Sequence, residues 1–126
     1  MDRYLFDTDV IIDYLRGNET AIHFFDSFEG DFHISVISIA ELYSGVKGEQ
    51  ELKDMDYFIS IFSVNSVTKE IAVEAGKLRQ NWHKSHGMGL ADALIAATAG
   101  VEQMKLFSLN EKHFRMLKYL EVPYQK

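Results

Sequence analysis

Five short apolar runs, separated by longer segments with helical spacing, constrain the fold of this chain more than any other feature. In the intervening segments apolar residues recur every three or four positions, which indicates amphipathic helices. Strands that alternate with helices predict an α/β fold, with a short parallel five-stranded sheet covered by helices on both faces in three layers. The predicted strands lie at residues 4–6, 32–36, 62–64, 105–109 and 119–122.

The length of 126 residues predicts a single domain over residues 1–126. The chain has no cysteine, so it has neither a disulfide framework nor a thiolate metal site. No apolar run approaches the roughly 18 residues of a membrane span, and the first residues do not resemble a secretion signal. We therefore expect a cytoplasmic protein with no membrane partner.

The charge is distributed unevenly along the chain. Residues 1–63 carry four Lys and Arg against thirteen Asp and Glu, whereas residues 64–126 carry nine against six. The net charge of −6 argues against strong nonspecific binding to nucleic acid by the chain as a whole. Basic residues of the second half are candidates for contact with a phosphate backbone, with a solvated helix face as the alternative. These candidates are Lys112, His113 and Arg115.

Oxygen-bearing side chains follow several of the predicted strands. Parallel strands bring their carboxyl ends to one edge of the sheet, where ligands bind in open α/β folds. We therefore expect these side chains to form one acidic pocket. They are Asp7 and Asp9 after the first strand, Glu41 on the helix after the second, Ser108 and Asn110 after the fourth, and Asp92 near the start of an apolar helix.

Taken singly, most of these residues have a structural explanation. Asp9 is a candidate N-cap for the first helix, and Asn110 for the last. Ser38 and Glu41 match a capping box that would open a helix at Ser38. Asp92 has the position of an acid that complements a helix dipole.

Taken together, the acids point to a metal site. Capping does not explain Asp7 at a strand end, or Asp92 in an alanine-rich helix where alanine would be more favourable. Clustered carboxylates repel one another unless a positive charge lies between them. A hard divalent cation, Mg²⁺ or Mn²⁺, prefers oxygen ligands and accounts for the whole set.

Other chemistries receive less support from the sequence. The five histidines lack zinc-ligand spacing, and there is no phosphate-binding glycine motif or serine nucleophile elbow. Two alternatives stay open: a haloacid-dehalogenase-type phosphatase that uses Asp7 and Asp9, and a non-catalytic module that binds a metal and a partner. Both leave Glu41 or Asp92 without a role.

Four segments, in this order, resemble the signature segments of PIN domains: LFDTDVIIDYL, SVISIAELYSGV, GLADALIAATA and LFSLNEKHF. In order, spacing and total length the chain resembles the VapC-type toxins of type II toxin–antitoxin pairs. The resemblance covers essentially the whole chain, and it implies a PIN-like fold and a Mg²⁺- or Mn²⁺-dependent endoribonuclease. It also implies an RNA substrate (tRNA or another structured RNA), a VapB-like antitoxin and a homodimer.

The resemblance also implies roles for individual residues. Asp7, Glu41 and Asp92 match the metal-binding carboxylates, and Asn110 stands where the family has a fourth acid or an asparagine. The neutral Asn110 weakens the case for a second tightly bound ion. Secondary positions are the hydroxyl-bearing Thr8 and Ser108, and Asp9, which occupies a variable position.

Overall fold

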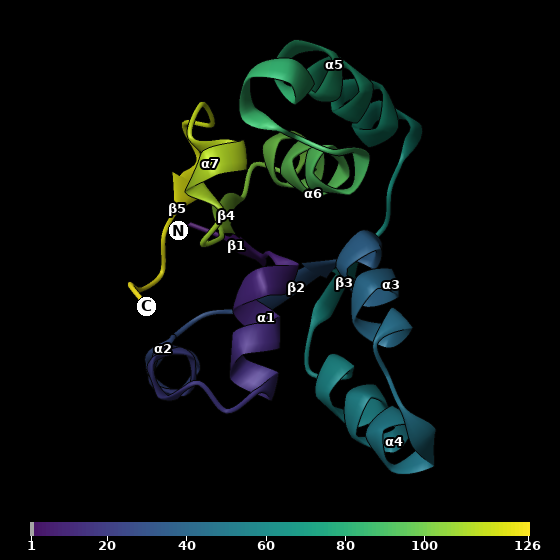
Figure 1. Cartoon of the computed structure of the whole chain (residues 1–126), viewed down its shortest axis with the longest axis vertical. Helices are drawn as coiled ribbons and strands as arrows, with labels where there is room; N and C mark the ends of the chain where they lie inside the picture. Colours follow the sequence, from purple (N-terminus) through teal and green to yellow (C-terminus); the bar gives the residue numbers. More distant parts are fainter. Residues whose placement is uncertain (1) are drawn as a thin grey trace.

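The structure is a computed structural model, and it describes residues 2–126. Figure 1 shows a central sheet with helices on either side. The strands are β1 (Tyr4–Phe6), β2 (Phe32–Ser35), β3 (Ser63–Asn65), β4 (Lys105–Phe107) and β5 (Leu120–Glu121). The helices are α1 (Thr8–Leu15), α2 (Glu19–Ser27), α3 (Val36–Ser44), α4 (Gly48–Ile59), α5 (Lys69–His86), α6 (Leu90–Val101) and α7 (Glu111–Phe114).

The five strands form one parallel sheet in the order β3-β2-β1-β4-β5. The predicted α/β class, strand number and parallel pairing are therefore confirmed. From β1 the chain builds the sheet toward β3, and it then returns to add β4 and β5 on the other side of β1. The boundary between β1 and β4 is thus the topological switch point, where open parallel sheets place their ligand sites.

The strands are apolar on both sides because helices cover both faces of the sheet. Leu5 and Leu106 point into a core formed with α5, α6 and α7. Phe6 and Phe107, one residue further along each strand, point into a second core formed with α1 to α4. This alternation follows from the two-residue period of a strand. It explains why the sequence shows continuous apolar runs instead of an alternating pattern.

Two helices near the switch point begin at residues other than those expected. The N-cap of α1 is Asp7, whose Oδ1 accepts the N–H of Thr8 at 2.8 Å, so Asp9 is not the cap and the expectation that capping does not explain Asp7 is wrong. The N-cap of α3 is Ser35, whose Oγ accepts the N–H of Ile37 at 3.0 Å. The predicted helix start at Ser38 is therefore wrong, and Ser38 is the third residue of α3, where its hydroxyl is available for another contact.

The long helix α5 has clear start and stop signals. Thr68 is its N-cap, and its Oγ1 accepts the N–H of Ile71 at 3.2 Å. Gly87 ends the helix in the left-handed region at φ +70°, a conformation that glycine adopts without steric strain. The short turn that follows leads directly into α6. In residues 2–126, no helix combines the length and apolar character that crossing a bilayer requires.

The core under α1 and α2 depends on Phe6, which is fully buried. Replacing Phe6 by alanine should lower the free energy of unfolding by about 3–5 kcal/mol, because it leaves a cavity among closely packed rings. Urea unfolding measures this change. Tyr57→Ala is the control, since Tyr57 is 79% exposed and its loss should change stability by less than about 0.5 kcal/mol. Equal effects of the two substitutions would contradict the assignment of this core. The aromatic rings that pack around Phe6, with ring centroids 5.2–6.1 Å from its own, belong to Phe24, Phe25, Phe28, Phe32, Phe62 and Phe107.

Candidate active site

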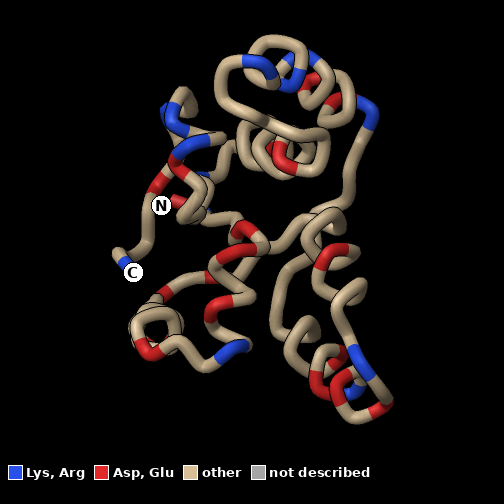
Figure 2. The backbone as a smooth tube through the Cα atoms, viewed as in Figure 1, with Lys and Arg blue, Asp and Glu red and all other residues tan. Residues whose placement is uncertain are grey.

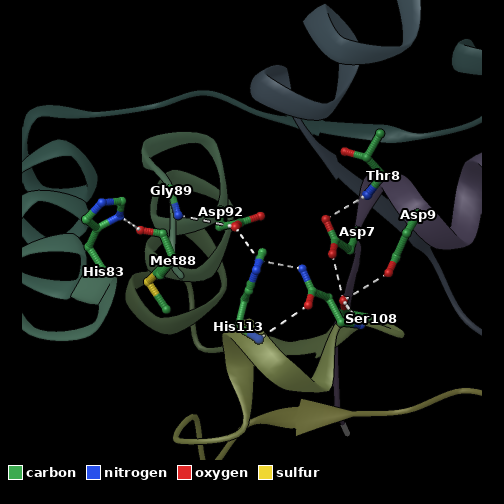
Figure 3. Close-up of polar contacts among 10 residues, drawn as sticks. Asp7, Thr8, Asp9, His83, Met88, Gly89, Asp92, Ser108 and His113 are labelled. Atoms are coloured by element: carbon green, nitrogen blue, oxygen red, sulfur yellow. Dashed lines mark hydrogen bonds and ion pairs between the residues drawn. The ribbon is translucent and has the colours of Figure 1, made fainter. Parts of the chain in front are cut away.

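The switch point brings Asp7 and Ser108 side by side. Phe6 pairs with Phe107 in the register of β1 and β4, and the N–H of Asp7 donates to the carbonyl of Phe107 at 2.9 Å. The next residues of the two strands therefore meet, and Ser108 Oγ donates to Asp7 Oδ2 at 2.6 Å (Figure 3). The sequence prediction that these two strand ends share one edge is confirmed.

Asp7 is 5% exposed, although other acidic side chains lie nearby. The pKa of Asp7 is raised to about 8, chiefly by burial, with a further contribution from the nearby charge of Asp9 and a smaller one from Asp92. The hydrogen bonds from Ser108 and the Thr8 N–H favour the ionised form and oppose part of this rise. Without a compensating positive charge, this carboxylate therefore holds a proton near neutral pH.

Asp9 ties α1 to the loop that follows β4. Its Oδ2 accepts the N–H of Leu109 at 3.0 Å and lies 3.4 Å from Ser108 Oγ. Its Oδ1 is buried and has no hydrogen-bond partner among residues 2–126. Burial raises the pKa of Asp9 above its usual value, as it does for Asp7. A half-buried carboxylate with one buried oxygen thus lies next to the buried Asp7.

A hydrogen bond with the Thr8 hydroxyl connects the Glu41 carboxylate to this edge of the sheet. Thr8 Oγ1 lies 2.7 Å from Glu41 Oε1 and 2.8 Å from Ser38 Oγ. A threonine hydroxyl has one hydrogen, so Thr8 donates to the carboxylate and accepts from Ser38. The capping-box explanation of Glu41 does not hold, because Ser35 and not Ser38 opens α3.

Asp92 lies in the first turn of α6, and its Oδ2 has two partners. The N–H of Gly89 lies 3.3 Å from this oxygen, so the predicted role at the helix start is present. His113 Nδ1 lies 2.8 Å from the same oxygen, as Figure 3 shows. Asn110 is the N-cap of α7, as expected, since its Oδ1 accepts the His113 N–H at 3.3 Å.

Short contacts connect the predicted site residues around one edge of the sheet. From Asp7 they run to Ser108, whose Oγ accepts the N–H of Asn110 at 3.0 Å, and from Asn110 through His113 to Asp92. On the other side, Thr8 connects to Glu41. In residues 2–126, however, no three His or carboxylate side chains form a ready-made metal site. Each carboxylate is turned toward hydrogen-bond donors of its own.

Among the other charged residues, Asp13 is paired elsewhere in the fold, whereas Lys112 and Arg115 are exposed. Asp13, a third acid of α1, is engaged elsewhere: it accepts the Tyr124 hydroxyl at 2.8 Å and Lys126 Nζ at 3.1 Å. Lys112 and Arg115 are exposed on and beside α7, and within residues 2–126 neither has an acidic side chain within 4 Å. In Figure 2, basic residues gather around α5 and α7, and acidic residues on the side of α1 to α4.

Comparison with known proteins assigns the family. A family model described as the PIN domain matches residues 4–118. The chain belongs to the PIN-domain family. It is similar to Ribonuclease VapC10 of Mycobacterium tuberculosis, with 38% identity over 95% of this chain and 92% of that protein.

Solved structures of this PIN-domain group have the same fold. A toxin–antitoxin complex from Klebsiella pneumoniae matches with a TM-score of 0.86 and 28% identity, over 98% of this chain and 99% of that one. VapBC2 from Rickettsia felis, bound to a promoter DNA fragment, matches with a TM-score of 0.78 and 25% identity, over 93% and 94% of the two chains. The predicted resemblance to PIN domains and VapC-type toxins is confirmed.

Sequence reasoning missed two contacts in this PIN domain. Ser38 is fully buried and supports Thr8, but its position resembles a helix start, which concealed this contact. His113 was expected among residues that contact phosphate, whereas its Nδ1 faces Asp92. Neither contact has a local signal, because the partners lie 30 and 21 residues apart in the sequence.

The buried Asp7 should make the metal-free protein less stable as the pH rises. Its pKa is about 8 in the fold against 3.8 ordinarily, so the folded state retains a proton that the unfolded state loses. Stability from this group is present in full below pH 3.8 and is lost as the pH rises to about 8. Asp7→Asn keeps the cap acceptor and removes the charge.

In EDTA at pH 8 we expect Asp7→Asn to unfold at a higher temperature than the parent. The free energy of unfolding of the variant should exceed that of the parent by more than about 1 kcal/mol, since a pKa shift of one unit corresponds to about 1.4 kcal/mol. It should shrink steadily between pH 8 and pH 4. Thermal unfolding followed by circular dichroism measures this, and a variant less stable than the parent across that range would refute the electrostatic description of Asp7.

Proposed function

We propose that this chain is the toxin of a type II toxin–antitoxin pair, a metal-dependent endoribonuclease that hydrolyses RNA phosphodiesters. The observation that carries the proposal is the connected set of Asp7, Glu41 and Asp92 at the switch point of a PIN domain. The name of a relative with 38% identity, Ribonuclease VapC10, supports the same activity.

The residues at the site fit a hard divalent ion, Mg²⁺ or Mn²⁺. All candidate ligands are carboxylate or amide oxygens, which these ions prefer. The raised pKa of Asp7 and the unpartnered Oδ1 of Asp9 mark a place where added positive charge would be stabilising. We propose Asp7, Glu41 and Asp92 as the residues that hold the ion, with Asn110 as a further oxygen donor.

In this mechanism the chain's own residues orient the reacting groups. A bound divalent ion would neutralise phosphate charge and make water a better nucleophile. Ser108 and the Thr8 N–H fix the Asp7 carboxylate, and the Thr8 hydroxyl fixes Glu41. Held in this way, the carboxylates present preorganised negative charge, so little reorganisation is needed when substrate arrives.

The RNA substrate would approach along the basic side of the molecule. Lys112 and Arg115 are exposed close to Asn110 and His113, and no acidic side chain among residues 2–126 competes for them. Lys and Arg neutralise backbone phosphates whatever the base sequence. We propose that this surface positions RNA, a tRNA or another structured RNA, so that a phosphodiester reaches the acidic edge.

A VapB-like antitoxin is the proposed inhibitor. The similarity to toxin–antitoxin complexes supports such a partner. A groove of about 460 Å³ runs beside the site, with Glu41, Leu42, Glu51, Asp54 and Met55 among its lining residues. Its lining is mostly apolar and has three acidic residues against one basic residue, Arg16, which suits a partner segment that carries apolar residues and an arginine or lysine. We also propose the homodimer that the resemblance implies, and a cytoplasmic location.

The geometry favours the nuclease over the alternatives. A phosphatase of the haloacid-dehalogenase type would use Asp7 and Asp9, and it leaves Glu41 and Asp92, which are held at the same edge, without a role. The non-catalytic module does not explain why Thr8 and His113 hold two further carboxylates at the same edge.

Replacing Asp92 by asparagine should abolish RNA cleavage while leaving the fold intact. The substitution preserves size and hydrogen bonding at the start of α6 but removes the charge that would bind the ion. Incubation of antitoxin-free protein with total RNA and Mn²⁺, followed by mapping of the cut ends, measures this. Asp26→Asn, on the exposed face of α2, is the matched control and should cleave normally. Mn²⁺-dependent cleavage that persists in Asp92→Asn would count against the proposal.

Removing the charges of Lys112 and Arg115 should weaken RNA binding for all sequences alike. In the Asp92→Asn background, which prevents cleavage, each lost phosphate contact should reduce the slope of log affinity against log salt by about 1. Fluorescence anisotropy at several salt concentrations measures the slope. Lys53→Ala, on α4, is the control and should leave it unchanged; identical slopes for all variants would exclude the proposed RNA path.

A further inference from the structure

We propose that His113 is a positioning residue that holds the Asp92 carboxylate so that only its Oδ1 faces the metal site. This inference rests on the proposed function and assigns His113 a role other than phosphate binding. Its basis is the 2.8 Å contact between His113 Nδ1 and Asp92 Oδ2, which joins α7 to the first turn of α6.

The two oxygens of Asp92 have different surroundings. Oδ2 faces both the Gly89 N–H at 3.3 Å and His113 Nδ1 at 2.8 Å, whereas no hydrogen bond within residues 2–126 reaches Oδ1. A carboxylate with one oxygen held by two donors has a fixed rotamer and a single free oxygen. Ligands of metal ions are commonly oriented by such outer hydrogen bonds.

The proton on Nδ1 follows from the charges around it. Nδ1 lies 2.8 Å from Asp92 Oδ2 and 2.8 Å from Asn110 Nδ2, and one ring nitrogen either donates or accepts. A bare Nδ1 would place its lone pair against a carboxylate oxygen, which is repulsive. We therefore assign the hydrogen to Nδ1, so that it donates to Asp92; the Asn110 amide nitrogen, also a donor, is then not its hydrogen-bond partner.

The imidazole is confined on its far side by the turn between α5 and α6. A Cβ atom at Gly87 would lie 3.3 Å from His113 Nε2, closer than ordinary contact. The turn cannot easily move away, because Met88 is fully buried and its carbonyl lies 3.0 Å from His83 Nδ1 (Figure 3). Gly87 therefore has a second function besides ending α5: it leaves room for the ring.

Two substitutions of His113 separate hydrogen bonding from packing. Asparagine places its Nδ2 where the imidazole has Nδ1, so His113→Asn retains the donor. His113→Leu places a carbon there and removes it. We expect His113→Leu to weaken Mn²⁺ binding roughly 10- to 100-fold, the usual effect of losing an outer hydrogen bond to a metal ligand. His113→Asn should retain most of the affinity.

A glycine pair tests the same inference away from the ligands. Gly87→Ala and Gly48→Ala both place alanine at positive φ, +70° and +79°, but a Cβ at Gly48 meets no atom within 4 Å. Both variants therefore carry backbone strain, and only Gly87→Ala displaces the imidazole. We expect only Gly87→Ala to weaken Mn²⁺ binding.

The experiment is a Mn²⁺ titration of the antitoxin-free protein, followed by electron paramagnetic resonance of free Mn²⁺, with circular dichroism to verify folding. RNA affinity in EDTA is measured in parallel and should be the same for the parent and His113→Leu. Unchanged Mn²⁺ affinity in His113→Leu, or an equal loss in His113→Asn, would overturn the inference and leave the nuclease proposal standing.

Two other outcomes would also overturn the inference. Loss of RNA affinity in EDTA with intact Mn²⁺ affinity would assign His113 to phosphate contact and overturn the positioning role. A parent protein that binds no Mn²⁺ would overturn the proposed function, and this inference with it.

Discussion

The structure depends on one unfavourable placement, the burial of the Asp7 carboxylate next to other acids at the end of β1. Burial and the charge of Asp9 together raise its pKa to about 8. Asp7 caps α1, but a neutral asparagine could do the same, and removing a carboxylate from water is costly unless it is neutralised or paired. A divalent ion that binds at this edge would supply the missing positive charge.

The sheet produces this arrangement through its register. Pairing of Phe6 with Phe107 sets Asp7 beside Ser108, and the switch point between β1 and β4 keeps the edge open for a ligand. Acidic and basic residues also lie mainly on opposite faces of the sheet. The acidic first half forms α1 to α4 on one face, and the more basic second half forms α5 to α7 on the other (Figures 1 and 2). An acidic pocket and a basic approach can therefore meet at the same edge.

Much of this could be predicted from the sequence, and the remainder depends on how helices dock. Short apolar runs located the strands, and their shared direction placed Asp7 and Ser108 at one edge. Ser35 and Ser38 are both competent to cap α3, and only the tertiary structure selects Ser35 and directs Ser38 to Thr8. The contact between His113 and Asp92 likewise joins two helices whose relative rotation no local pattern specifies. The family resemblance implies which carboxylates bind the ion, but it does not indicate which side chains hold them in place.

The central claim is that Asp7, Glu41 and Asp92 act on one divalent ion, and anomalous X-ray scattering from crystals soaked in Mn²⁺ tests it most directly. The account predicts a manganese peak at the carboxyl end of β1, about 2 Å from carboxylate oxygens of Asp7 and Asp92, with Glu41 in contact directly or through water. A peak at another surface with this edge empty, in crystals where the edge is open to solvent, would contradict it.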